Sequence, residues 1–203
     1  MTRKLPRYIL ILALAFTTGL QAQTLQEQME ALGKTAAQGS HSAIDELESM
    51  VNQTLHRQTD PANKPMNRAL IKAAFTTLAE EAGKGSNTAL EALKYANGKQ
   101  LLRSFTVDAF GIAAGMGNRE SLRMLLDYKL NDFLLSSTVF ALQPAAEKNI
   151  PEAVDFLVKV IDNPGDKALW HAASRGLVGA AALGNEKAKA ALKRYAGNDE
   201  SAH

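Results

Sequence analysis

The stretch that decides the fold of this chain is Ala113–Tyr128, with the sequence AAGMGNRESLRMLLDY. Four related segments align with it without internal gaps in the 203-residue chain. Each segment carries a small residue at one shared position, and these positions are spaced by 46, 32, 32 and 35 residues. The five small residues are Ala43, Ala89, Ser121, Ala153 and Ala188. Periods of this size indicate a repeat array, in which no unit buries its apolar face alone.

Every segment predicts the second helix of a helix pair. Four of the five copies are aliphatic one and four positions after the small residue, as at Leu122 and Leu125. That spacing places both side chains on one helical face. Apolar stretches before the segments predict the first helices, over residues 24–38, 66–82, 99–115, 131–148 and 166–183. The sequence therefore predicts an all-α fold, a right-handed α-solenoid of about five antiparallel helix pairs.

The sequence also predicts where helices are interrupted. Residues 58–65 contain two prolines and predict a surface loop. Pro144 predicts a kink or an end to regular helix within its apolar stretch. Residues 163–165, Asn-Pro-Gly, predict a break, after which Asp166 caps the next helix. We expect residues 197–203 to form a frayed, flexible tail.

Residues 1–22 have the layout of a secretory signal peptide. Three basic residues precede an apolar run from Tyr8 to Phe16, and residues 20–22 (Leu-Gln-Ala) form a cleavage site. The run is shorter than the roughly 18 apolar residues of a membrane span, which favours a cleaved signal over an uncleaved anchor. We therefore expect a periplasmic or secreted domain over residues 23–196, with no stable membrane span after signal removal.

Charge and cysteine content narrow the possible partners. The signal contains three of the 23 Lys and Arg residues and no Asp or Glu, so the mature chain has 20 basic and 21 acidic residues, a net charge of −1. A near-neutral chain lacks the basic footprint of a nucleic-acid-binding protein. The chain has no cysteine, but about 180 residues bury a sufficient core without disulfides.

The best repeat signature is Arg175–Tyr195, RGLVGAAALGNEKAKAALKRY. Its small residues, Gly-Asn turn and following alanines and leucine resemble the cadence of HEAT-like repeats. The resemblance covers roughly residues 24–196, and Pro144 is similar to the proline that bends the first helix of such repeats. It implies an α-solenoid whose second helices line a concave partner-binding surface.

Ankyrin repeats are the main alternative. Residues 113–120, with Ala-Ala, Gly-Asn and Glu at fixed offsets, resemble the ankyrin core pattern, as do residues 145–152. Ankyrin units are joined by polar hairpins, whereas residues 101–108 and 132–140 are apolar and continuous with predicted helix. The long first helices therefore favour the HEAT-like interpretation, and tetratricopeptide-like pairs come third.

The chain shows no motif for catalysis or for cofactor binding. Residues 83–86 lack the spacing of a P-loop. Ser174 lies within a predicted helix and not on the strained turn of a nucleophile elbow. His41 and Asp45 share a helical face but have no third metal ligand, and His171 is predicted to be a packing or surface residue. The sequence thus predicts no catalytic residue, no cofactor and no metal site.

The best candidate binding site is the polar stripe on the predicted second helices. Its members are Glu120, Arg123, Asp127, Glu152, Asp155 and Lys159, with Trp170 as a further candidate. We expect adjacent helices to place Arg123 near Asp155 and Asp127 near Lys159. One interpretation is a solvated charge ladder that contributes about 0.2–0.5 kcal/mol per pair. The other is a mixed-charge groove that recognises a protein segment, while core packing is the alternative role for Trp170.

These patterns favour an exported helical-repeat protein that acts as an interaction scaffold or adaptor for a protein partner in the cell envelope. The alternative is an enzyme, lyase-like or other, with an unrecognised site, since HEAT-like folds occur in lyases that act on bound chromophores and in DNA-repair glycosylases. Export argues against both of those activities, and the near-neutral charge argues against the DNA-repair glycosylase. A third possibility is a subunit that stacks through apolar ends, but an amphipathic first helix and a basic last helix predict polar, capped ends.

Overall fold

A computed structural model describes residues 19–56, 63–127, 134–163 and 167–200 of the chain, and all regular structure in these ranges is helical, as predicted. The helices are α2 (Gly19–Ala37), α3 (His41–His56), α4 (Asn63–Gly83), α5 (Asn87–Asn97), the 3₁₀ helix η1 (Gln100–Leu102), α6 (Arg103–Gly115), α7 (Arg119–Leu126), α8 (Leu135–Glu147), α9 (Pro151–Asp162), α10 (Lys167–Ala182) and α11 (Glu186–Glu200). Most of the predicted signal peptide and the predicted cap Asp166 lie outside the described residues.

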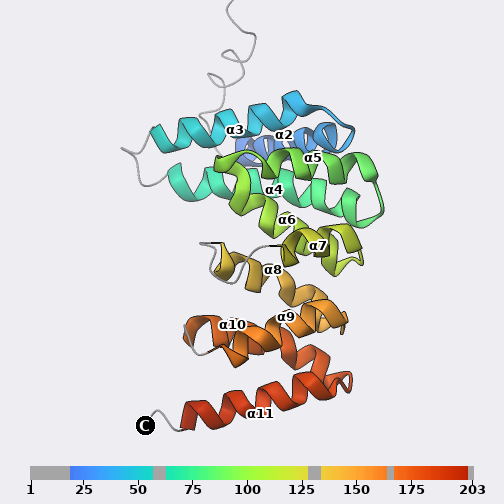
Figure 1. The fold of residues 1–203 in the computed structure, drawn as a ribbon. Helices are drawn as coiled ribbons and strands as arrows, with labels where there is room; N and C mark the ends of the chain where they lie inside the picture. The colour runs from blue at the N-terminus through green and yellow to red at the C-terminus, as the bar shows by residue number, and fades with distance from the viewer. Residues whose placement is uncertain (1–18, 57–62, 128–133, 164–166, 201–203) are drawn as a thin grey trace, which may run out of the picture.

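The helices form two rows. The closest packing joins α2 to α4, α4 to α6, α6 to α8 and α8 to α10, and we call these five helices the first row. Helices α3, α5, α7, α9 and α11 form the second row, and each packs against the first-row helix that precedes it in the chain. Figure 1 shows the resulting stack, with α2 and α3 at one end and α11 at the other.

The five turns that join first-row to second-row helices share one geometry. A single residue in each turn has a left-handed backbone, namely Gly39 (φ 97°), Gly85 (φ 98°), Gly117 (φ 100°), Asn149 (φ 60°) and Gly184 (φ 90°). In the third turn the N–H of Gly117 donates to the carbonyl of Ala114 at 2.9 Å, and the N–H of Asn118 donates to that of Ala113 at 3.0 Å. The other four turns repeat both bonds. This is the Schellman ending of a helix, which favours glycine or asparagine at the left-handed residue.

The residue after the left-handed position begins the next helix. The Asn118 side chain accepts a hydrogen bond from the N–H of Ser121 at 2.9 Å, and Ser86 and Asn185 cap α5 and α11 in the same way. Ile150 has no side chain that can do this, and Pro151 takes the first position of α9 instead. The small residue three positions after each cap is buried in all five second-row helices. Turn, cap and buried residue together fix the angle at which each second helix returns.

Glycines let the first-row helices approach to backbone contact. A Cβ atom added at Gly111 of α6 would lie 2.5 Å from the carbonyl oxygen of Ala141 in α8. At Gly33 of α2, the same atom would lie 2.3 Å from the carbonyl oxygen of Ala74 in α4. Gly176 of α10 likewise sits against the Gln143 backbone. The predicted close approach at the small residues of α10 is therefore seen along most of the first row.

Two first helices are shorter than the sequence predicted. The stretch 99–115 divides into η1 and the 13-residue α6, and α8 begins at Leu135 and also has 13 residues. Lys99 has an extended backbone, and the 3₁₀ turn after it buries Leu102 completely. The apolar residues before α6 therefore fill the core from a turn and not from a longer helix. Long first helices consequently no longer distinguish a HEAT-like array from an ankyrin-like one.

Other predicted interruptions also differ from the structure. Helix α4 begins at Asn63, so the last three residues of the predicted 58–65 loop are helical, and Pro65 occupies a first-turn position that needs no N–H donor. Helix α8 continues past Pro144 to Glu147. Helix α11 continues to Glu200, so most of the predicted flexible tail is helical.

The C-terminal end of the stack is not as polar as predicted. Val178 of α10 is 57% exposed, and Leu183, in the turn before α11, is 63% exposed. Both are among the four large hydrophobic residues that are exposed in the described part of the chain. The basic residues of α11 therefore cap only part of this end.

The close contact between α6 and α8 can be tested by whether Gly111→Ala raises or lowers the free energy of unfolding. In an open helix, Gly→Ala stabilises by about 0.8–1 kcal/mol through helix propensity. At Gly111 the added methyl group collides with Ala141, so we expect Gly111→Ala to lower the free energy of unfolding by about 1–3 kcal/mol. Denaturant titration measures the change. A more stable variant would show that α6 and α8 are not in backbone contact.

Candidate protein-interaction face

The exposed sides of α3, α5, α7, α9 and α11 form what we call the second-helix face. At its N-terminal end, the Lys99 ammonium lies 2.8 Å from Asp45 and 3.2 Å from Glu48, both on α3. The Tyr95 hydroxyl also donates to Asp45 at 2.9 Å. These two hydrogen bonds, that from Lys99 first, lower the pKa of the Asp45 carboxyl. The segment after α5 is thus fastened to α3 by side chains that remain accessible to water.

Glu120 is the charged centre of the next contact, between α5 and α7. The Arg123 guanidinium, one turn later on the same helix, donates to both carboxylate oxygens at 2.9 and 2.7 Å. Lys94 of α5 reaches the same carboxylate at 3.2 Å. These bonds, with that from Arg123 the largest, lower the pKa of Glu120 to about 2. Glu120 is therefore ionised at neutral pH.

Two further ion pairs join α9 to α11. Lys187 lies 2.8 Å from Asp155, and Arg194 lies 2.8 Å from Asp162. All four side chains are about half exposed or more, so each pair contributes about 0.2–1 kcal/mol. Side-chain ion pairs therefore join the segment after α5 to α3, α5 to α7, and α9 to α11.

The predicted pairs between α7 and α9 are not formed. Arg123 bonds to Glu120 and not to Asp155, which pairs with Lys187. Among the described residues, Asp127 and Lys159 have no ion-pair partner within 4 Å. The reason is local: Glu120 is one turn from Arg123 and accepts both of its N–H groups, so the guanidinium does not reach across. We call this missing step the α7–α9 break.

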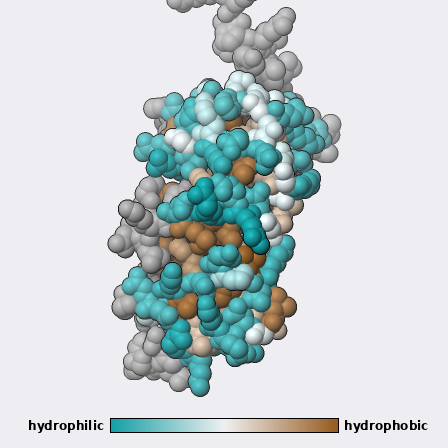
Figure 2. Space-filling view, turned by 45° about the vertical axis from the view of Figure 1, so that its right-hand side comes forward, coloured by the Kyte–Doolittle hydropathy of each residue, from teal (hydrophilic) through white to brown (hydrophobic). Residues whose placement is uncertain are grey.

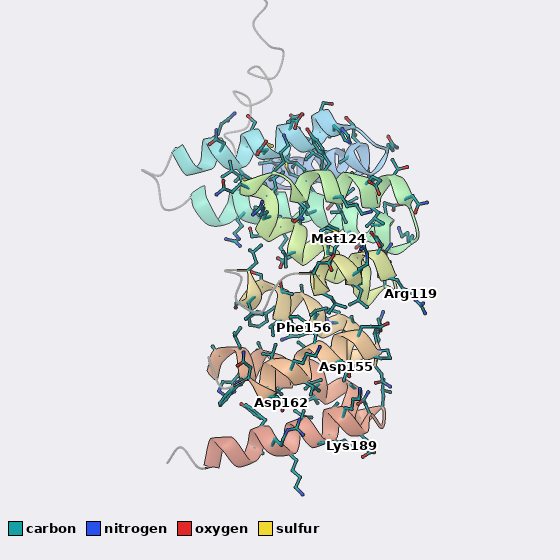
Figure 3. The ribbon with its side chains drawn as sticks, in the orientation of Figure 1. Arg119, Met124, Asp155, Phe156, Asp162 and Lys189 are labelled. Carbon is teal, nitrogen blue, oxygen red and sulfur yellow. The ribbon has the colours of Figure 1, made fainter. Side chains whose placement is uncertain are left out.

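Partly exposed apolar side chains lie at the level of this break. Figure 2 shows an apolar patch in the middle of the molecule, between polar regions towards either end. Met124 and Leu126 of α7 are half-buried, as is Val158 of α9, and Phe156 keeps 8% of its surface exposed. Figure 3 shows Met124 and Phe156 on successive second-row helices. The break thus combines apolar surface with charged side chains of both signs.

Helix α7 is the shortest α-helix of the second row. It has eight residues, against 16 in α3, 12 in α9 and 15 in α11. Eight residues make about two helical turns, or about 12 Å. Helices α7 and α9 consequently pack much less against each other than α9 and α11 do.

The remaining predicted site residues have different surroundings. Glu152 is exposed in the first turn of α9, where a carboxylate complements the helix dipole. Trp170 is half-buried, and its indole N–H donates to the Asn163 carbonyl at 3.0 Å, which ties the start of α10 to the end of α9. Trp170 therefore makes a structural contact at the C-terminal end of α9.

Sequence reasoning missed an aromatic contact at the N-terminal end. The His41 and Tyr95 rings stack with their centroids 4.1 Å apart and almost parallel, and the Lys99 ammonium lies 5.0 Å from the Tyr95 ring centroid. Tyr95 is at the same repeat position as Asp127 and Lys159, and this position could have indicated from the sequence that Tyr95 belongs to the second-helix face. His171 is exposed and hydrogen-bonds to the Tyr195 hydroxyl, consistent with the predicted packing or surface role. No group of three potential metal ligands occurs among the described residues.

Comparisons with known proteins do not place the chain in a family. No protein-family model matches it, and no curated protein or solved structure does so either. No helix in the described ranges combines the length and apolar character that crossing a membrane requires.

The environment of Glu120 can be tested directly by its titration. The folded pKa is lowered to about 2 from the ordinary value of 4.5 for a glutamate. The stabilising contribution of the ionised carboxylate is therefore fully present above about pH 4.5 and is lost as pH falls through about 2. We expect carboxyl NMR to show Glu120 titrating near pH 2. In Arg123→Met the midpoint should move upwards, while Arg194→Met, near the far end of the stack, should leave it unchanged. A midpoint near 4.5 in the unmodified protein would contradict the described geometry.

The exposed charges of α7 and α9 should contribute little to folding. We expect simultaneous replacement of Arg123, Asp127, Asp155 and Lys159 by alanine to lower the free energy of unfolding by less than about 2 kcal/mol, since it removes two exposed ion pairs. Denaturant titration gives the value. A larger loss would mean that these side chains are part of the structural framework and not a free surface.

Proposed function

We propose that this chain is an exported helical-repeat protein, a HEAT-like α-solenoid, that binds a protein partner through its second-helix face. Three observations support the repeat interpretation: five turns of one geometry, five buried small residues in one register, and first-row helices stacked in chain order. The basic start and apolar run at the N-terminus support export to the periplasm or cell exterior. The partner is accordingly a protein of the cell envelope.

The observation that carries the binding proposal is the α7–α9 break. Elsewhere, ion pairs join α5 to α7, α9 to α11, and the segment after α5 to α3, and the two charges of each pair neutralise each other. At the break, Asp127 and Lys159 have no ion-pair partner within 4 Å among the described residues, and each directly follows a partly exposed apolar residue, Leu126 or Val158. Apolar contact supplies affinity, and charges of both signs at its rim supply orientation and selectivity. A segment with an apolar anchor flanked by acidic and basic residues fits this arrangement.

The charge of the face also limits the class of partner. Both signs are interleaved on α7 and α9, and the chain without its signal has a net charge of −1. A polyanion such as nucleic acid would meet as much repulsion as attraction there. The face therefore suits a protein segment better than a polymer of one charge.

Binding through the break is tested by comparing variants as bait in pull-downs from an envelope extract. We expect a partner retained by the unmodified protein to be lost with Leu126→Glu, which puts a charge into the apolar patch, and weakened with the fourfold alanine variant. Val178→Glu, on exposed apolar surface of α10, is the matched control and should retain the partner.

The variants that lose the partner identify the surface that binds it. Circular dichroism and thermal melting establish that each bait is folded before it is used. Retention by all variants would place binding on another surface. If the unmodified protein captures no partner, the adaptor proposal fails, and screening for small-molecule ligands or activity becomes the next step.

A further inference from the structure

First-row helices contact each other through fixed positions, counted back from the left-handed turn residue. The position six residues before that residue faces the next helix: Gly33 before Gly39 touches Ala74 of α4, and Gly111 before Gly117 touches Ala141 of α8. Gln143, six before Asn149, follows the same rule and donates to the Ala172 carbonyl of α10 at 2.7 Å. The position two before the turn residue faces the same way, as Glu147 shows against Gly179.

Helix α10 has no following first-row helix among the described residues, yet it presents the same face. The position six before Gly184 is Val178, and the position two before is Ala182. Both are exposed, and with His171 and Arg175 they form a single exposed stripe at helical spacing. Val178 is 57% exposed where its counterparts Gly33 and Gly111 are buried. The C-terminal end therefore presents a helix-docking face without an occupant.

Helix α2 presents the complementary face at the other end. The residues that receive the preceding helix lie five, eight or eleven positions before the turn residue, as do Gly179 in α10, Ala141 in α8 and Ala74 in α4. In α2 these positions are Lys34, Ala31 and Gln28, counted from Gly39. All three are exposed. Among the described residues, no helix packs against this face of α2, whereas every later first-row helix has a preceding neighbour.

We propose that the C-terminal end of one copy docks on the N-terminal end of a second copy, with α10 and the partner's α2 packed as adjacent first-row helices are. In the register of α6 and α8, in which Gly111 meets Ala141, Val178 lies against Ala31, and Arg175 lies near Glu27. On the second row, Lys193 of α11 comes to the side of α3 that carries Glu46. None of these four charged side chains has an ion-pair partner within 4 Å among the described residues.

The charges of the two ends support this choice of occupant. Helices α2 and α3 carry five Asp or Glu residues and one Lys, whereas α10 and α11 carry six Lys or Arg and three Asp or Glu. Opposite net charges steer the two ends together and disfavour contacts between like ends. A head-to-tail contact does not close on itself as a two-fold dimer does, so it generates open chains or rings. The polar residues of the α2 stripe make this contact sensitive to salt.

The test blocks one end at a time. The protein is expressed from its full sequence, purified with the N-terminus that the cell leaves, and studied by sedimentation velocity in low salt. We expect the unmodified protein to form larger species as its concentration rises, and Ala31→Arg and Val178→Arg to stay monomeric alone. Both positions are exposed, so the monomers should keep their fold by circular dichroism. An equimolar mixture should give a one-to-one dimer and nothing larger, because each variant keeps one working end.

A charge exchange tests the register. We expect Arg175→Glu and Glu27→Arg each to weaken association by about tenfold or more, and the chain carrying both substitutions to recover it. Arg123→Glu, at the α7–α9 break, is the matched control and should associate normally. A chain that stays monomeric at every concentration would overturn the proposal. So would association that ignores the end variants, or a mixture of the two blocked variants without a dimer. Because these readouts need no envelope partner, failure here and failure of the second-helix face are distinguishable.

Discussion

Backbone contact between successive first-row helices is the constraint on which the rest of the structure depends. Helices normally keep 8–10 Å between their axes because side chains separate them. At Gly33 and Gly111, a neighbouring carbonyl oxygen occupies the place where a Cβ atom would be. The first row is consequently dense and continuous. The second-row helices are positioned by this row through their turns, and they contact one another largely through long polar side chains.

The two rows differ in composition because the first row packs through backbone contacts and the second row largely through long side chains. The first-row contacts need small residues and few polar atoms, and α6, α8 and α10 supply them. Each second-row helix has a buried small residue near its start, followed in all but α11 by buried aliphatic residues one and four positions later, while the outer side is free to vary. Charges on that outer side can therefore change without disturbing the packing beneath, which suits a surface that recognises a partner.

The turns were predictable from the sequence, whereas two helix starts were not. A glycine or asparagine followed by a capping side chain typically ends one helix and begins the next. Residues such as Gly117 and Asn118 therefore located the helix pairs correctly. Leu101 and Leu102 continue the apolar pattern of α6, so periodicity alone extended that helix backwards. Only the tertiary structure shows that an extended Lys99 and a 3₁₀ turn carry Leu102 into the core.

The partners of the charged side chains were less predictable than their positions. Spacing placed Arg123 and Asp155 on the outer side of their helices correctly. It could not choose among several acceptors within reach of a long side chain, because such exposed alternatives differ by less than about 1 kcal/mol. The same limit applies to the ends of the stack. Val178 is exposed because no further first-row helix follows α10 in the described chain. This exposure cannot be predicted from the local sequence around Val178.

The sequential order of the stack also has a consequence for how the chain folds. The side-chain ion pairs and hydrogen bonds of greatest sequence separation reach α3, from Lys99 to Asp45 across 54 positions and from Tyr95 to Asp45 across 50, and most other side-chain hydrogen bonds span fewer than 40. Contacts this local close only short loops, so contact order is low and the entropic barrier to folding is small. Each helix pair can dock on the pair before it as soon as it emerges, without waiting for the C-terminus. The order of synthesis and the order of assembly are then the same.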